Sequence, residues 1–444
     1  MCPLPRLALP GPEELTAHAI VHTLGLAGKV RIEELGRSRT GRPIPLISVG
    51  EGPLSALVVG APHPNEPTGC LTILRMLARF AAMAEPAIVP GWQWHFIPAI
   101  DIDGVALNAG WLSESPALET YLAHFYRPPF RLQPEYGFPL DLPQYSFSTE
   151  TPENACWKKA LEMTKPDLQC SLHGADSGGA FFILSAEHRD LADRLTPLPA
   201  SFGVSLNAVG EPFAEMAVFQ PGVFSFPSVA AIIEGGIRHG SKPKTFWNAG
   251  DSSAGFAAER FGTFSLTCEV PLWRDAREGD SRLSDRTLGE VVDERVRLLR
   301  EDAEALGDSL PALRPAIGTF EAHALLESLE DALAGAVGVM SALARARPRG
   351  AEGHRLRISD LVSAEAGTYC LRTPAMLLRL ASITGSGAVE DLARSMLDAR
   401  LTRFRKATRL SPVPLAWATG VQMAAIDAAA SVLGRSSATV SRPV

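Results

Sequence analysis

Short apolar runs alternate with amphipathic segments over roughly residues 44–273 of the chain. Runs such as residues 56–60 and 264–270 have the length and the β-branched or aromatic content of buried strands. Segments such as residues 71–78 and 153–163 instead carry apolar residues at helical spacing. Strands that alternate with helices are typical of an α/β domain with a substantially parallel sheet. The predicted strands are residues 44–49, 56–60, 92–100, 167–173, 181–185, 229–233 and 264–270, and the predicted helices are residues 13–26, 71–78, 153–163, 187–195 and 251–260.

This pattern changes near Arg274. Beyond it, apolar residues recur at helical spacing and strand-like runs almost disappear. A chain of 444 residues is also too long for one small core. We therefore predict an α/β domain over residues 1–275, an all-α C-terminal domain over residues 276–435 and a disordered tail over residues 436–444. The helices predicted in the C-terminal domain are residues 284–306, 320–345, 376–381, 389–405 and 421–433.

The composition narrows the class of protein. Apolar residues make up 46% of the chain and charged residues 20%, which is typical of a globular protein. The net charge of −7 offers no general attraction to nucleic acid or to an anionic membrane, and we expect neither as a partner. No stretch has the length and apolarity of a membrane span, and the first residues lack the pattern of a signal peptide. Six cysteines without zinc-knuckle spacing predict reduced thiols in a cytoplasmic protein, and homo-oligomerisation stays open.

The loop over residues 61–69 is the strongest candidate for chemistry. It leaves a predicted strand and enters a predicted helix, which is where α/β proteins place their functional groups. Within it, His63 and Glu66 are possible metal ligands three residues apart. His173 ends a predicted strand before a glycine-rich turn, and Glu269 lies near the end of another. Two histidines and one glutamate would form an open zinc site, and a second carboxylate would take a proton from the attacking water.

Each of these positions also has an ordinary interpretation. A histidine in a loop or at a strand end can simply form a hydrogen bond, and Glu269 could be a charge at a strand edge. Cys268 and Val270 nevertheless indicate that Glu269 lies in a buried sheet, where an unpaired carboxylate is costly. All four candidates lie at predicted strand ends or in adjoining loops. This shared placement favours their joint interpretation as an amide hydrolase.

The combination of motifs resembles the zinc metallocarboxypeptidase family related to carboxypeptidase A. The resemblance rests on His63-Pro-Asn-Glu66, a distant His173 and a strand-borne Glu269, and it covers roughly residues 30–275. It implies that His63, Glu66 and His173 bind Zn²⁺ and that Glu269 is the general base and acid. It also implies a mixed, mostly parallel eight-stranded sheet with helices on both faces. The all-α C-terminal domain lies outside the resemblance.

The chain departs from this family where the substrate would bind. Family peptidases grip the terminal carboxylate of the substrate with an Asn-Arg pair, and the matching stretch here has Asn108 followed by Ala109. Arg127 or Arg131 could supply a bidentate fork instead, or either could be structural. Trp247 and its neighbour lie near the position of the mobile tyrosine of the family, which predicts an apolar wall. The predicted substrate-binding residues are therefore Asn108, Arg127 and Trp247.

A further feature widens the range of substrates. Asn65, together with the Pro-Thr-Gly that follows Glu66, resembles the aspartoacylase and succinylglutamate desuccinylase branch of the same clan, which hydrolyses N-acyl amino acids. The leading hypothesis is zinc-dependent hydrolysis of an amide bond in a small peptide or peptide-like substrate. The alternatives are an N-acyl amino acid deacylase and a non-catalytic zinc-containing binding protein. A binding protein would not need Glu269 as a proton shuttle, which argues against the last.

Overall fold

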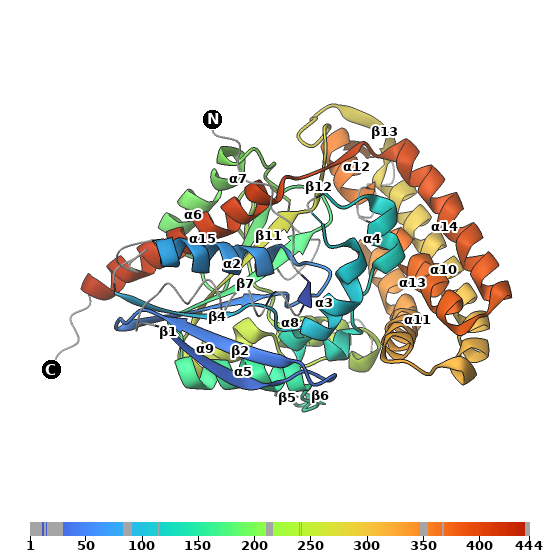
Figure 1. Ribbon diagram of the computed structural model, residues 1–444. Helices are drawn as coiled ribbons and strands as arrows, with labels where there is room; N and C mark the ends of the chain where they lie inside the picture. Colours follow the sequence, from blue (N-terminus) through green and yellow to red (C-terminus); the bar gives the residue numbers. More distant parts are fainter. Residues whose placement is uncertain are drawn as a thin grey trace.

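The structure is a computed structural model that describes residues 11–12, 15, 30–82, 91–113, 115–209, 216–238, 240, 242–346, 354–365 and 368–439. A large sheet with helices on both faces lies beside a bundle of helices (Figure 1). The helix predicted over residues 13–26 lies, apart from Leu15, outside the described residues.

The sheet has nine strands in the order β1-β2-β4-β3-β7-β11-β8-β10-β9. The four neighbours β4, β3, β7 and β11 are parallel, whereas β2 and β8 run antiparallel to the strands beside this centre. The predicted class, a mixed and mostly parallel α/β sheet with an all-helical C-terminal region, is confirmed. The strands are β1 (Val30–Arg37), β2 (Pro43–Val49), β3 (Leu54–Gly60), β4 (Trp92–Ile97), β7 (Leu168–Ala175), β8 (Phe181–Leu184), β9 (Val218–Gln220), β10 (Val223–Ser225) and β11 (Phe264–Pro271).

Two predictions about this sheet differ from the structure. The count is nine strands and not eight, and the short β9 and β10, which are absent from the predicted strands, form one edge. Residues 229–233, predicted as a strand, begin the helix α8 (Val229–Arg238). A short apolar run does not distinguish a strand from a buried helix by periodicity. Here Ser228 starts the helix, since its Oγ accepts a hydrogen bond from the backbone N–H of Ala231 at 3.3 Å.

Helices cover both faces of the sheet. Helices α2, α6, α7 and α15 lie together on one face, and α5 and α9 lie on the other (Figure 1). The central strands are buried, as expected for strands covered on both sides. The helices of this part are α2 (Thr68–Ala82), α3 (Ile102–Asn108), α4 (Leu118–His124), α5 (Pro152–Thr164), α6 (Arg189–Leu195), α7 (Leu198–Ser201), α8 (Val229–Arg238), α9 (Ser253–Phe261) and α15 (Leu415–Thr439), with short 3₁₀ turns at Ala109–Trp111, Phe130–Leu132, Pro134–Tyr136 and Pro243–Thr245.

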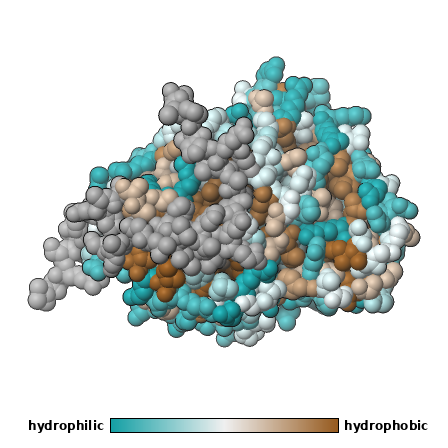
Figure 2. All heavy atoms as spheres, in the orientation of Figure 1, coloured by the Kyte–Doolittle hydropathy of each residue, from teal (hydrophilic) through white to brown (hydrophobic). Residues whose placement is uncertain are grey.

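The helical bundle has a hydrophobic core of its own. Apolar residues of its helices pack there with Tyr121, Phe125 and Trp273 from the α/β part. On the side shown in Figure 2, its surface carries hydrophilic side chains with hydrophobic ones scattered among them. Among the described residues, no helix combines the length and the apolarity needed to cross a membrane. The bundle contains α10 (Leu288–Leu313), α11 (Phe320–Ala346), α12 (Ile358–Glu365), α13 (Tyr369–Thr384) and α14 (Gly387–Ala407), with a 3₁₀ turn at Arg314–Ala316.

The last helix, α15, packs on the sheet and not in the helical bundle. It was expected in the C-terminal helical domain, but Val421, Ile426 and Ala429 are buried in the core of the sheet. Helical periodicity shows that a segment has an apolar face, and it does not show which core that face joins. Residues 436–439, predicted as part of a disordered tail, continue this helix, and residues 440–444 lie outside the described residues. Small strand pairs connect the two parts and their loops: β5 (Leu140–Leu142) with β6 (Tyr145–Phe147), β12 (Trp273–Asp275) with β15 (Leu410–Pro412), and β13 (Leu283–Thr287) with β14 (Arg355–Arg357).

Candidate metal centre

The loop after β3 turns sharply before it enters α2. Ala61 has a positive φ of 47°, a conformation that residues other than glycine rarely adopt and that is often found at functional sites. The backbone N–H of Glu66 donates to the carbonyl of His63 at 3.0 Å, which closes a tight turn. Gly69 has no space for a side chain, because a Cβ would lie 2.6 Å from the Cβ of Leu172. This close approach brings the loop next to the end of β7.

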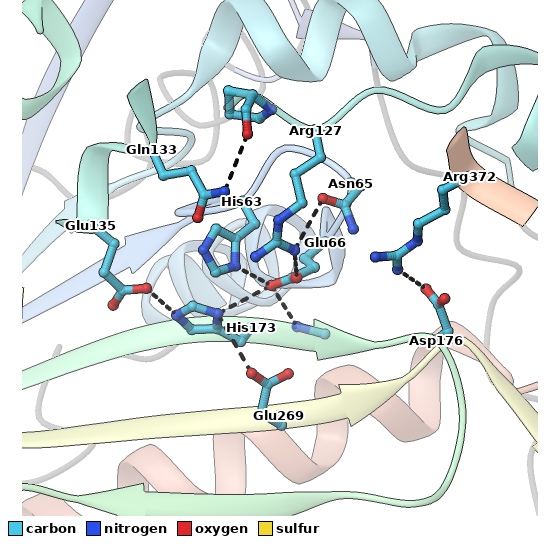
Figure 3. Close-up of polar contacts among 12 residues, drawn as sticks. His63, Asn65, Glu66, Arg127, Gln133, Glu135, His173, Asp176, Glu269 and Arg372 are labelled. Atoms are coloured by element: carbon cyan, nitrogen blue, oxygen red, sulfur yellow. Dashed lines mark hydrogen bonds and ion pairs between the residues drawn. The ribbon is translucent and has the colours of Figure 1, made fainter. Parts of the chain in front are cut away.

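Three of the predicted ligands meet at this point. Nδ1 of His63 lies 3.0 Å from Oε2 of Glu66, and Nδ1 of His173 lies 3.1 Å from the same oxygen (Figure 3). One possible ligand atom from each residue lies within 4.8 Å of the others. All three side chains are buried, and they form the one cluster of this kind within the described parts of the chain. The geometry therefore agrees with the set of residues that the sequence predicts for a metal.

The residues also fit zinc chemically. Two imidazoles and one carboxylate are a donor set that zinc enzymes use. Nε2 of His63 is buried and has no hydrogen-bond partner among the described residues, so the bonding of this ring is incomplete within the protein. Burial and the nearby Arg127 lower the pKa of His63 to about 4, against the opposite effect of Glu66. His63 is consequently neutral at physiological pH, as a metal ligand must be.

Charges around the other two ligands oppose the effect of burial. Burial alone would raise the pKa of Glu66, but His63 and Arg127 hold it well below its usual range. Burial alone would lower the pKa of His173, but the carboxylates of Glu135, Glu66 and Glu269 raise it well above its usual range. Both pKa shifts favour the charged forms of these side chains, and a metal ion would compete with a proton for His173.

Glu269 lies beside the metal ligands. The register of the parallel strands β7 and β11 pairs it with His173, and its Oε1 is 3.6 Å from Nδ1 of that histidine. Only 8% of the residue is exposed. The sequence predicts a strand end for each residue, and the pairing of β7 with β11 in the sheet is what brings them together. The role of Glu269 as general base and acid stays a prediction.

Glu135 is a further member of the site that the sequence did not predict. Its Oε2 lies 2.8 Å from Nε2 of His173, and its Oε1 accepts a hydrogen bond from Oγ of Ser253 at 3.3 Å. His173 thus lies between the carboxylates of Glu135 and Glu66 (Figure 3). Carboxylates that bind the second nitrogen of a metal-ligating histidine orient the ring and increase its basicity. Glu135 lies in a 3₁₀ turn without periodicity, and the Pro-rich, aromatic composition around it was the one available signal.

Arg127 reaches the centre of the site. Its Nη1 donates to Oε1 of Glu66 at 2.7 Å and lies 3.5 Å from Oδ1 of Asn65. The backbone around it is held by the helical bundle, since Oγ of Ser328 donates to the carbonyl of Arg127 and the N–H of Phe130 donates to Asp331 at 2.9 Å. Arg127 thus pairs with a candidate metal ligand, and its role in substrate binding stays a prediction.

A second arginine approaches from the bundle and was not predicted. Nη2 of Arg372, in α13, donates to Oδ1 of Asp176 at 2.8 Å, three residues beyond His173 (Figure 3). The same carboxylate accepts hydrogen bonds from the backbone and hydroxyl of Thr368 and from the hydroxyl of Tyr121. This buried network attaches the bundle to the loop that follows His173, a candidate metal ligand.

The other two predicted substrate residues form hydrogen bonds with segments around the site. The amide of Asn108 donates to the carbonyls of Gly104 and Tyr126 and accepts from Nε1 of Trp111 and the N–H of Tyr126. These bonds hold the segment that leads to Arg127. Trp247 donates from Nε1 to the carbonyl of Gly250 and packs edge-on against Phe130 and Tyr136. Tyr136 in turn stacks near His63, with 6.3 Å between ring centroids. A role for Asn108 or Trp247 in substrate binding stays a prediction.

Comparisons with known proteins add the following. No protein-family model and no curated protein matches this sequence. Similar solved structures include carboxypeptidase A from Helicoverpa armigera, with 11% identity, a TM-score of 0.39 and coverage of 77% of this chain and 75% of the other. A metallo-carboxypeptidase from Burkholderia cenocepacia has 15% identity, a TM-score of 0.34 and coverage of 74% and 69%. A Shewanella amazonensis protein, assigned by inference to the metallopeptidases, has 12% identity, a TM-score of 0.38 and coverage of 58% and 84%. At these similarities the neighbours do not assign a function to this chain.

Proposed function

We propose that this protein is a zinc-dependent amide hydrolase of the metallocarboxypeptidase type that acts on a small peptide or peptide-like substrate. The observation that carries the proposal is the convergence of His63, Glu66 and His173 within 4.8 Å, with Glu269 beside them. A zinc ion held by the three ligands would polarise the scissile carbonyl and lower the pKa of a water molecule.

The side chains of the chain itself have separate roles in this reaction. Oε1 of Glu269 accepts the proton of the attacking water and then delivers it to the nitrogen of the leaving amine. Arg127 donates to Glu66 through Nη1, and its guanidinium also orients a negatively charged group of the substrate. Glu135 holds the ring of His173 in place through Nε2. Burial of the ligands excludes bulk water and strengthens each of these interactions.

Two substitutions test this proposal. Glu269→Gln should retain bound zinc but lose turnover by about 10²- to 10⁴-fold, because the amide cannot take the proton. His173→Ala should lose the metal, since one of its three ligands is gone. Zinc content is measured by elemental mass spectrometry and turnover with the substrate found below. Normal turnover by Glu269→Gln would refute the mechanism.

The substrate class is decided by a hydrolysis screen. A mixed pool of short peptides and N-acyl amino acids is followed by mass spectrometry, with and without a zinc chelator, and with Glu269→Gln as the blank. Chelator-sensitive loss of single C-terminal residues supports the carboxypeptidase. Release of acyl groups alone supports the N-acyl amino acid deacylase, for which Asn65 beside Arg127 is the structural argument. The absence of turnover with zinc bound would favour the binding protein.

We also propose that the reaction takes place in the cytoplasm. Cys70, Cys156, Cys170, Cys268 and Cys370 are free thiols, as in proteins of a reducing compartment.

A further inference from the structure

A buried glutamine of the last helix contacts the candidate site from behind. Gln422, in α15, has no exposed surface. Its Oε1 accepts a hydrogen bond from Oγ1 of Thr72 at 2.6 Å. Its Nε2 donates to the backbone carbonyl of His173 at 2.9 Å and to that of Cys268 at 3.3 Å. Both polar ends of the side chain are thus bonded inside the protein.

The three partners of Gln422 belong to the three segments that build the site. Thr72 lies in α2, the helix that begins directly after the loop with His63 and Glu66. His173 is itself a candidate ligand, and Cys268 directly precedes Glu269. A single amide therefore connects the helix that follows the loop with His63 and Glu66, the strand with His173 and the strand with Glu269.

Packing alone does not account for a glutamine here. Its neighbours Val421, Ala425 and Ile426 are fully buried and apolar, so an apolar side chain would suit this contact between helix and sheet. Burying an amide costs free energy unless its hydrogen bonds are made. All three hydrogen bonds of Gln422 go to the segments that build the site. These bonds set the spacing between the segments.

Other contacts fasten α15 to α2 without touching the site. Asp427 accepts two hydrogen bonds from Arg79, each of 2.8 Å. Arg75 donates to Oγ1 of Thr419 and, at 3.1 Å, to the carbonyl of Ala416. Loss of Gln422 would therefore leave the helix docked, and Asp427 offers a matched control in the same helix pair.

We propose that Gln422 is a positioning residue that fixes His173 and Glu269 relative to the loop with His63 and Glu66. This inference rests on the proposed function for the meaning of the site. Its first readout, zinc affinity, needs no substrate. Because Gln422 does not touch the substrate, its loss acts on metal binding and kcat and not on KM.

The experiment compares Gln422→Met, which keeps the length of the side chain but removes its hydrogen bonds, with Asp427→Asn. Zinc affinity is measured by competition with a chromogenic chelator, and kcat and KM at saturating zinc. We expect Gln422→Met to weaken zinc binding about tenfold or more, as is common for groups that orient metal ligands, and to lower kcat with little change in KM. Asp427→Asn should lower the melting temperature but keep the zinc affinity of the wild type.

Several outcomes would overturn the inference. Unchanged zinc affinity and kcat in Gln422→Met would do so, and so would an equal loss of affinity in Asp427→Asn. If Gln422→Met does not fold, Thr72→Val tests the inference instead. This substitution removes one of the three hydrogen bonds of Gln422 with little change in side-chain volume. Thr72→Val should weaken zinc binding several-fold, and an unchanged affinity would contradict the role. Zinc binding without any amide turnover by the wild type refutes the proposed function and leaves the comparison of affinities standing.

Discussion

Glu135→Gln is the substitution that best separates the charge around His173 from its geometry. The wild-type carboxylate lies 2.8 Å from Nε2 of His173, and the amide oxygen of glutamine can accept the same hydrogen bond. The ring therefore keeps its orientation while its partner loses its negative charge. A hydrogen bond to a charged group contributes about 1.5–3 kcal/mol and a neutral one about 1 kcal/mol. The difference, roughly 0.5–2 kcal/mol, corresponds to a loss of zinc affinity of about 2- to 30-fold.

The measured loss of zinc affinity in Glu135→Gln depends on pH. Zinc requires neutral His173, and the carboxylates of Glu135, Glu66 and Glu269 raise the pKa of this histidine against the effect of burial. Wild-type affinity should therefore keep increasing with pH until the pH exceeds that raised pKa. In Glu135→Gln the pKa of His173 is lower, so its affinity stops increasing at a lower pH. At acidic pH, weaker proton competition offsets the weaker ligand, and at alkaline pH only the loss remains.

The assay is competition with a chelator at several pH values between about 6 and 9. The ratio of the dissociation constant of Glu135→Gln to that of the wild type should increase with pH, towards about tenfold at the alkaline end. Calorimetry in two buffers of different ionisation enthalpy should show fewer protons released by the variant at neutral pH. Glu327→Gln, which removes a partly exposed carboxylate that pairs with Arg131 instead of His173, is the control. A ratio of one at every pH would show that Glu135 does not act on His173.

Two predictions concern stability. Asp176→Ala leaves the buried guanidinium of Arg372 without its carboxylate and should lower the free energy of unfolding by about 3–5 kcal/mol, measured with urea; a loss below 1 kcal/mol would contradict the buried network. Burial raises the pKa of Asp101 to about 7, although Arg39 opposes the shift, so the folded state holds a proton that the unfolded state has released. Stability from this group is present below the unfolded pKa and is lost as the pH rises from about 4 to about 7, by up to about 4 kcal/mol. Asp101→Asn should therefore melt at a higher temperature than the wild type at pH 8 but not at pH 4, and an equal difference at both would refute the assignment.

The sequence predicts the centre of the site better than its surroundings. His63, Glu66, His173 and Glu269 follow or end neighbouring strands of a parallel sheet, whose carboxyl ends meet at one edge. Local patterns of strand and loop are therefore sufficient to bring them together. Arg372 is different, because it reaches Asp176 across 196 residues, and no local pattern shows which helix face of the bundle will approach the sheet.

The same distinction applies to the fold. The predicted sheet class is confirmed because its strands are buried on both faces and read as apolar runs. The helix α8 was predicted as a strand because a short apolar run suits either structure. Helix α15 was assigned to the wrong core because the choice between two cores depends on contacts such as Arg79 with Asp427, which are 348 residues apart.

The return of α15 to the sheet also fixes when the site can form during synthesis. The ribosome completes the strands with His173 and Glu269 first, then the whole bundle through α14, and the helix with Gln422 last. Domains generally fold as units while the chain emerges. Strand β11 ends at Pro271 and α15 begins at Leu415, so more than 130 further residues are made before this covering helix begins. A nascent or truncated chain that stops after α14 would expose the apolar face of the sheet that α15 covers. Exposed apolar surface of this kind favours aggregation, chaperone binding and proteolysis of the incomplete chain.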